Sequence, residues 1–112
     1  MIEDYSFGAI IINGKIFDKD LIILPNRIIE NWWRKDGHSL CLEDLEAIYS
    51  DPSRLLVIGT GASGRMQVPD NVESELKKRG FGVIIKPTKD AVVEFNRISA
   101  KAPIIGAFHL TC

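Results

Sequence analysis

The sequence has little of what marks a disulfide-bonded, metal-binding or membrane protein. Its two cysteines, Cys41 and Cys112, form no C-x-x-C pair and no metal-ligand spacing, so we expect free thiols, a reducing compartment and no metal site. No apolar run approaches the ~20 residues that span a bilayer. The acidic start, Met1 to Asp4, is unlike a secretory signal or a transit peptide. We therefore expect a cytoplasmic protein without a membrane partner.

Charge of one sign is also scarce. The formal net charge is −1 over 112 residues, which provides no broad positive field to attract nucleic acid. Arg34-Lys35 and Lys77 to Arg79 are interpreted as solvated surface. Glutamine occurs once, at Gln67, and a shortage of thermolabile amides is typical of thermophilic proteins. Hydrophobic residues at 46% and charged residues at 26% predict one ordinary folded domain, residues 1–112.

The first half of the chain is dominated by extended segments. Asn13-Gly14 separates two apolar runs, 7–12 and 15–17. It predicts a β-hairpin, because both residues tolerate the positive φ of a type I′ turn. We expect further strands at 21–24 and 28–33. Apolar residues at helical spacing then predict a helix over 42–50.

The second half alternates between strands and helices. Strands are expected at 55–58, 82–85 and 103–110, with helices from Pro69 to Gly80 and from Thr88 onward. Asp70 and Glu73 have the spacing of a capping box, and Thr88 can cap the later helix. This order predicts βαβ units. The expected fold class is α/β: a compact three-layer domain with a central mixed, largely parallel sheet, helices on its faces and an N-terminal β-hairpin.

A glycine-rich loop follows the strand at 55–58. Gly59 to Gly64 spells G-x-G-x-x-G, but the dinucleotide fingerprint needs a helix that begins at its third glycine. Here Val68-Pro69 delays the helix by about five residues, and the next strand ends at Lys86-Pro87 without a ribose-binding acid. We therefore expect no nucleotide cofactor, and no other cofactor is indicated.

The same loop allows a small-anion site. Glycines after a parallel strand expose backbone N–H groups, and Thr60, Ser63 and Arg65 add further donors. The alternative is a tight strand-exit loop whose glycines only permit the backbone angles. This alternative is favoured, because such loops outnumber anion sites.

Three other features of the sequence bear on function. His109 and Cys112 could form a nucleophilic pair, but no third group to orient them is evident, and we assign no catalytic residue. The acids Asp18 and Asp20 form no recognisable catalytic pair. Trp32 and Trp33 are adjacent in a predicted strand, so one can enter the core while the other is exposed as an interface anchor. Packing of both in the core, against different layers, agrees with the sequence at least as well.

Several ordered motifs together resemble a known family. They are Val57 to Gly61, Val68-Pro69, Leu76 to Gly80, Thr88, Ala91-Val92, Phe95-Asn96 and Phe108 to Cys112. The chain resembles the small α/β domain shared by adipogenesis-associated cytosolic proteins and a mitochondrial complex I assembly factor. The resemblance implies a layered α/β fold with a mixed sheet and no agreed enzymatic activity. It also singles out Gly59, Thr60, Gly61, Thr88 and Asn96 as candidate site residues.

Three functional hypotheses follow. The leading one is a non-catalytic protein-binding or assembly module with Trp32 or Trp33 in the interface. The second is a small-anion or metabolite site, possibly enzymatic, formed by Gly59, Thr60, Gly61, Ser63, Arg65 and Asn96. The third is a structural homo-oligomer built on the edge of the N-terminal hairpin.

Overall fold

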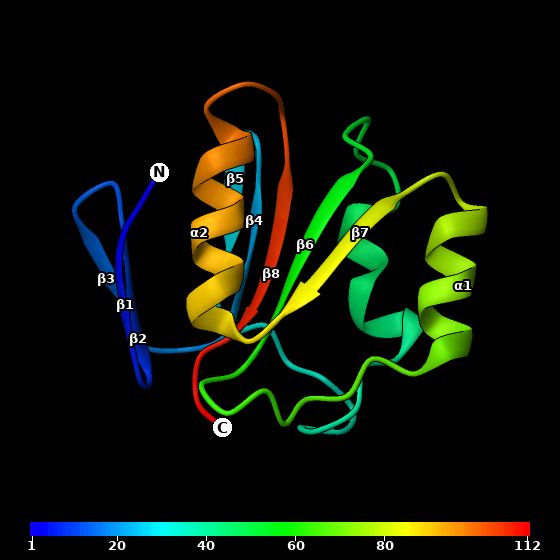
Figure 1. Ribbon diagram of the computed structural model, residues 1–112, viewed down its shortest axis with the longest axis horizontal. Coiled ribbons are helices and arrows are strands. Elements are labelled where there is room, and N and C mark those ends of the chain that lie inside the picture. The colour runs from blue at the N-terminus through cyan, green and yellow to red at the C-terminus, as the bar shows by residue number, and fades with distance from the viewer.

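Two β-sheets, two α-helices and one 3-10 helix make up the computed structural model, which describes residues 1–112 (Figure 1). In chain order the elements are β1 (Ile2–Ser6), β2 (Ala9–Ile12), β3 (Lys15–Phe17), β4 (Leu21–Leu24), β5 (Arg27–Ile29), η1 (Leu42–Ile48), β6 (Leu55–Thr60), α1 (Asp70–Lys78), β7 (Gly82–Lys86), α2 (Thr88–Ser99) and β8 (Ile105–His109). No helix is both long and apolar enough to cross a membrane.

The N-terminal strands form a small antiparallel sheet, called sheet A, in the order β1-β2-β3. The predicted hairpin is confirmed. Ile12 pairs with Lys15, and Asn13 (φ 50°) and Gly14 (φ 81°) occupy the left-handed region that a type I′ turn requires. Strand β1 was not predicted, because its mostly polar segment buries only Ile2 and has no apolar alternation.

The second sheet, sheet B, has the order β5-β4-β8-β6-β7. Strand β6 pairs in parallel with β7 and β8, whereas β4 pairs antiparallel with β5 and β8. The mixed α/β sheet is confirmed, but the expectation that it is largely parallel is not. An apolar run such as Leu21–Leu24 shows that a strand is buried on both faces and does not show its direction.

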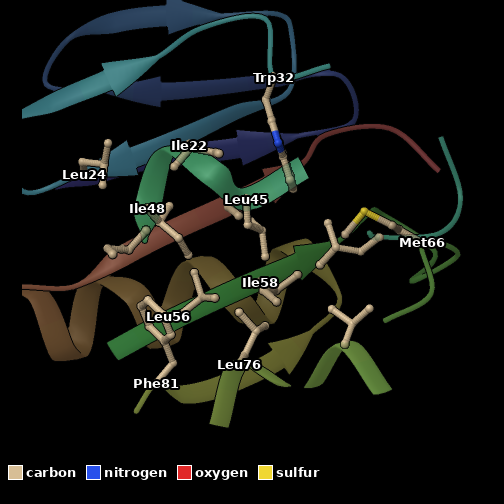
Figure 2. Close-up of a cluster of buried hydrophobic side chains, with 14 residues drawn as sticks. Ile22, Leu24, Trp32, Leu45, Ile48, Leu56, Ile58, Met66, Leu76 and Phe81 are labelled. Atoms are coloured by element: carbon tan, nitrogen blue, oxygen red, sulfur yellow. The ribbon is translucent and has the colours of Figure 1, made fainter. Parts of the chain in front are cut away.

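Side chains of sheet B alternate between two hydrophobic cores. In β4, Ile22 and Leu24 contribute to one core, and Leu21 and Ile23 contribute to the other. Figure 2 shows the first core, where η1 and α1 cover the sheet through Leu45, Ile48, Val72 and Leu76. The second core joins sheet B to α2 and to sheet A. Because sheet A and α2 both pack on the same face of sheet B, the predicted three-layer arrangement is not confirmed.

Several predicted element boundaries are wrong in detail. The segment over 42–50 is a 3-10 helix interrupted at Leu45, which has φ −109°. The strand expected over 28–33 ends at Ile29, and the chain turns at Asn31 with φ 56°. Prolines precede both α-helices at the N-cap, and neither cap forms a side-chain hydrogen bond, so the predicted capping roles of Asp70, Glu73 and Thr88 are not realised.

Candidate functional site

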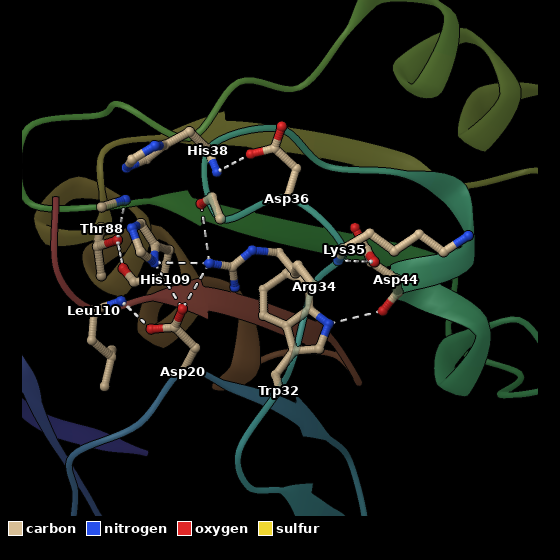
Figure 3. A network of polar contacts seen from close by, with 12 residues as sticks. Asp20, Trp32, Arg34, Lys35, Asp36, His38, Asp44, Thr88, His109 and Leu110 are labelled. Carbon is tan, nitrogen blue, oxygen red and sulfur yellow. Dashed lines mark hydrogen bonds and ion pairs between the residues drawn. The ribbon is translucent and has the colours of Figure 1, made fainter.

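A buried polar cluster lies where the start of β4, the loop after β5 and the end of β8 meet. Its three members, called the polar cluster below, are Asp20, Arg34 and His109 (Figure 3). Arg34 Nη2 lies 2.8 Å from Asp20 Oδ2, and His109 Nδ1 lies 2.7 Å from the same oxygen. The Leu110 amide donates to Asp20 Oδ1 at 2.8 Å. One carboxylate therefore binds three donors from two distant parts of the chain.

The geometry fixes where the protons of this cluster lie. The 2.7 Å contact requires a proton between His109 Nδ1 and Asp20 Oδ2, and an ionised carboxylate beside a guanidinium only accepts. Nδ1 therefore carries a proton and donates it to Asp20. Arg34 Nη2 lies 3.1 Å from His109 Nδ1, but both atoms are donors, so this contact is not a hydrogen bond. Nη2 instead donates to Asp20 and, at 3.3 Å, to the Gly37 carbonyl.

The surroundings stabilise the charged form of Asp20. Burial raises its pKa, but hydrogen bonds from His109, the Leu110 amide and Arg34 oppose burial and outweigh it. The pKa of Asp20 therefore lies below its ordinary value of 3.8. A charged carboxylate next to the 4%-exposed side chain of Arg34 gives the buried guanidinium the partner that it requires.

Several polar atoms of the cluster have no partner. Arg34 Nε and Nη1 and His109 Nε2 are buried without a hydrogen bond. The Arg34 guanidinium lies 4.7 Å from the centre of the Trp32 ring, close enough for a cation–π contact. Asp20 supplies the orienting group that His109 lacked in the sequence. No nucleophilic pair results, because His109 Nε2 forms no hydrogen bond to Cys112 or to any other group.

Thr88 connects this cluster to the glycine-rich loop. Its hydroxyl donates to the His109 carbonyl at 2.6 Å and accepts from the Gly61 amide at 2.8 Å. The Thr60 hydroxyl donates to the Lys86 carbonyl at 3.2 Å. The two threonines therefore tie the carboxyl ends of β6, β7 and β8 to one another.

The backbone amides of the glycine-rich loop are all engaged within the protein. Ala62 N donates to the Thr111 carbonyl, and Ser63 N and Arg65 N both donate to the Cys112 carbonyl. Gly64 N and Met66 N donate to carbonyls within the loop. The side chains of Ser63 and Arg65 are exposed, so a small-anion site here stays a prediction that depends on side chains alone.

Close contact with neighbouring atoms explains why two positions of the loop are glycine. A Cβ at Gly59 would lie 2.7 Å from the Phe108 ring and 2.9 Å from the Thr88 hydroxyl. At Gly61, which has φ 107°, a Cβ would overlap the carbonyl carbon of Cys112 and lie 2.8 Å from His109 Cδ2. The G-x-G pattern therefore allows Thr88 and the 108–112 segment to pack on the loop.

Asn96 lies apart from the loop. Its side-chain amide donates to the Ile2 carbonyl at 2.7 Å, and its oxygen accepts from the Ile2 amide at 2.9 Å. These two hydrogen bonds attach the start of β1 to α2. The structure thus brings Gly59, Thr60 and Gly61 together with Thr88, and leaves Asn96 about two turns further along α2, against β1 of sheet A.

The two tryptophans lie in different environments. Trp32 is 7% exposed and belongs to the core beneath η1, and its Nε1 donates to the Asp44 carbonyl at 2.8 Å. Trp33 is 77% exposed. The exposed tryptophan is therefore flanked by two buried residues, Trp32 and Arg34, which fix the backbone on both sides of it.

The sequence interpretation missed the polar cluster. Arg34 was assigned to solvated surface, but it is 8% exposed, and the lysine that follows it is exposed. Adjacent basic residues look alike in a charge pattern. A usable signal was the Trp-Trp-Arg sequence, because a buried aromatic next to an arginine favours a stacked guanidinium.

Comparison with known proteins assigns the family. The model of the family described as protein of unknown function (DUF498/DUF598) matches residues 2–109. A curated relative from Danio rerio, NADH dehydrogenase [ubiquinone] 1 alpha subcomplex assembly factor 3, is 33% identical over 110 residues. The match covers 96% of this chain and 62% of the relative, so the chain spans less than two thirds of that protein.

Solved structures show the same fold. The conserved hypothetical protein PH1505 from Pyrococcus horikoshii OT3 is 30% identical, with a TM-score of 0.83 over 100% of this chain and 99% of that one. XCC1710 from Xanthomonas campestris is 19% identical, with a TM-score of 0.81 over 98% of this chain and 83% of that one. Because the family model covers nearly the whole sequence, this chain belongs to the DUF498/DUF598 family.

Proposed function

We propose that this chain is a non-catalytic, assembly-type module that binds another protein through the surface around Trp33. The observation that carries the proposal is the 77% exposure of Trp33 between two residues that are at most 8% exposed. Exposed tryptophans are over-represented among the residues that dominate binding energy at protein interfaces. A backbone that is already fixed loses little conformational entropy when it binds.

The polar cluster has a supporting role in this proposal. Arg34 is held by Asp20 and by the Trp32 ring, and the Trp32 indole is held by the η1 backbone. Together these contacts hold the Trp33 main chain in a single position. The cluster therefore orders the binding surface.

One relative supports the same kind of role. The Danio rerio relative carries the name of an assembly factor, and assembly factors act by contacting other proteins. We extend that role to this chain as part of the proposal. The module would work in the cytoplasm, where its two free thiols, Cys41 and Cys112, stay reduced. Its net charge of −1 favours a protein partner over nucleic acid.

The test compares protein capture by three tagged forms of the chain: the natural sequence, Trp33→Ser and Val93→Ser. Val93 is the matched control, because it is apolar and 62% exposed on α2. Captured proteins are quantified by mass spectrometry from extracts of the source cells. We expect Trp33→Ser to lose a partner that the natural chain and Val93→Ser both retain.

Stability measurements separate binding from folding. Since Trp33 is exposed, Trp33→Ser should change the free energy of unfolding by no more than about 0.5 kcal/mol. If Trp33→Ser captures the same proteins in the same amounts as the natural chain, Trp33 is not the contact and the proposal fails.

A further inference from the structure

A groove lies at the other end of β4 from the polar cluster. Asp20 precedes β4, whereas the Pro25–Asn26 turn that follows β4 borders the groove. The groove has a volume of about 750 Å³ and lies between the inner face of sheet A, the β4–β5 hairpin and the last turn of α2. The turn that follows β2, the turn that follows β4 and the end of α2 border it, and these three segments lie at the upper end of the molecule in Figure 1.

The floor of this groove is apolar. It is formed by Phe17 of sheet A, Ile23 of β4, Phe95 of α2 and Ile104 before β8. All four belong to the second hydrophobic core and keep between 4% and 8% of their surface exposed. The groove therefore offers an apolar ligand a floor that is already ordered.

One wall of the groove is an unpaired strand edge. β5 pairs only with β4, and Leu24 pairs with Arg27 across a two-residue turn. In an antiparallel ladder the residues alternate, so the N–H and C=O of Ile28 point away from β4. No turn, loop or cap hydrogen bond occupies the Ile28 amide. The edge that lines the groove thus carries a free backbone donor and a free acceptor.

The rim of the groove carries an uncompensated positive charge. Lys15 and Glu30 form an ion pair across it at 3.8 Å, with both side chains more than half exposed. Arg27 also lines the groove and is exposed, and it forms no ion pair with any acid of the chain. An occupant with one acidic group would complement this rim.

We propose that the groove binds an extended segment of a partner protein that adds as a strand to the β5 edge, with an acidic side chain facing Arg27. Such a segment satisfies the free backbone groups of Ile28, covers the apolar floor with alternate side chains and neutralises the rim. A small amphipathic anion would use the floor and the charge but would leave the strand edge unpaired. The protein nature of the occupant rests on the proposed function, whereas the groove is a second contact surface, separate from Trp33.

The test uses selected peptides as probes. A displayed random library of peptides of about nine residues, within the usual length of strands, is selected on the full chain. Binders are synthesised in a plain form and in a form with N-methyl groups on alternate backbone nitrogens. We expect binders to alternate apolar and polar residues around one acid. We also expect them to shift the Ile28 and Glu30 amide signals in NMR spectra.

Two comparisons make the result decisive. Backbone N-methylation and Arg27→Glu should each weaken peptide binding at least about tenfold. Lys78→Glu, at an exposed cation of α1 that forms no ion pair, should leave it unchanged. Equal binding of N-methylated peptides, binding away from β5, or a library that yields no binder would each overturn the proposal. Decanoate serves as the probe for a small amphipathic anion. If decanoate shifts the NMR signals of the groove residues while every peptide leaves them unchanged, the proposal is also overturned.

These outcomes are separable from those of the Trp33 experiment. A chain that loses its partner on Trp33→Ser but binds no peptide keeps the proposed function without the groove. A chain that binds peptides in the groove but captures the same proteins after Trp33→Ser keeps the groove and loses Trp33 as the contact.

Discussion

Replacing Asp20 by asparagine tests whether the polar cluster stabilises the fold. The substitution preserves the shape of the side chain but removes the negative charge that Arg34 and His109 share. The Arg34 side chain is only 4% exposed, and the Trp32 ring lies against its guanidinium. The guanidinium would therefore remain buried without a counter-charge.

The expected loss of stability is large. Removing one partner of a buried ion pair typically costs about 3–5 kcal/mol, because the other charge stays uncompensated. An unfolding entropy of about 2.1 cal/mol/K per residue, applied to 112 residues, gives roughly 0.24 kcal/mol/K. Dividing the first figure by the second predicts a fall in Tm of about 13–21 °C for Asp20→Asn.

Urea unfolding at pH 7, followed by circular dichroism, measures this change directly. Asp18→Asn is the matched control, because Asp18 is an exposed acid on the same connection and should alter stability by no more than about 0.5 kcal/mol. Combining Asp20→Asn with Arg34→Met should cost less than the sum of the two single changes. A loss below about 1 kcal/mol for Asp20→Asn would refute the argument that Arg34 depends on this carboxylate.

Three further predictions concern the same region. Since the pKa of folded Asp20 lies below 3.8, its contribution is complete above about pH 5 and is lost as the pH falls through the folded value; the stability difference between the natural chain and Asp20→Asn should therefore shrink in acid urea titrations. Thr88→Val leaves two buried partners of the hydroxyl without a hydrogen bond and should cost about 2 kcal/mol or more in the free energy of unfolding. Gly61→Ala should cost clearly more than Gly14→Ala in calorimetry, because both glycines have positive φ but only Gly61 also lacks space for a Cβ.

The parts of the fold that the sequence predicted depend on local signals. The Asn13-Gly14 turn, the apolar run of β4 and the amphipathic pattern of α2 each identify an element from neighbouring residues alone, and all three are present. Strand direction was less accessible, because β4 finds its antiparallel partner β8 more than 80 residues along the chain. The residues near β4 in the sequence carry no signal that identifies β8 as its partner or sets the direction of the pairing.

The candidate site was harder to predict for the same reason. Asp20 and His109 are 89 residues apart, so the sequence neighbours of each residue gave no sign of the other. Thr88 stands where a capping residue would be expected, but its hydroxyl bonds to two neighbouring strand ends. The glycine pattern predicted a tight loop as one alternative, but the close contact of Gly59 and Gly61 with Thr88 and with residues 108–112 could be seen only in the tertiary structure.

The place of β8 in sheet B has a consequence for how the protein is made. This strand is the last of the strands in sequence but lies between β4 and β6 in the sheet. Without β8, no backbone hydrogen bonds join the β4–β5 hairpin to the β6–β7 pair. On the ribosome, residues 105–109 emerge after the other strands and helices of this domain. Until then, the β4–β5 hairpin and the β6–β7 pair each keep an unpaired edge. Pairings of such long sequence separation slow folding and expose edges to other chains. The native sheet therefore cannot form before residues 105–109 have left the ribosome, and a nascent chain stalled before residue 105 is the form that should depend most on chaperones.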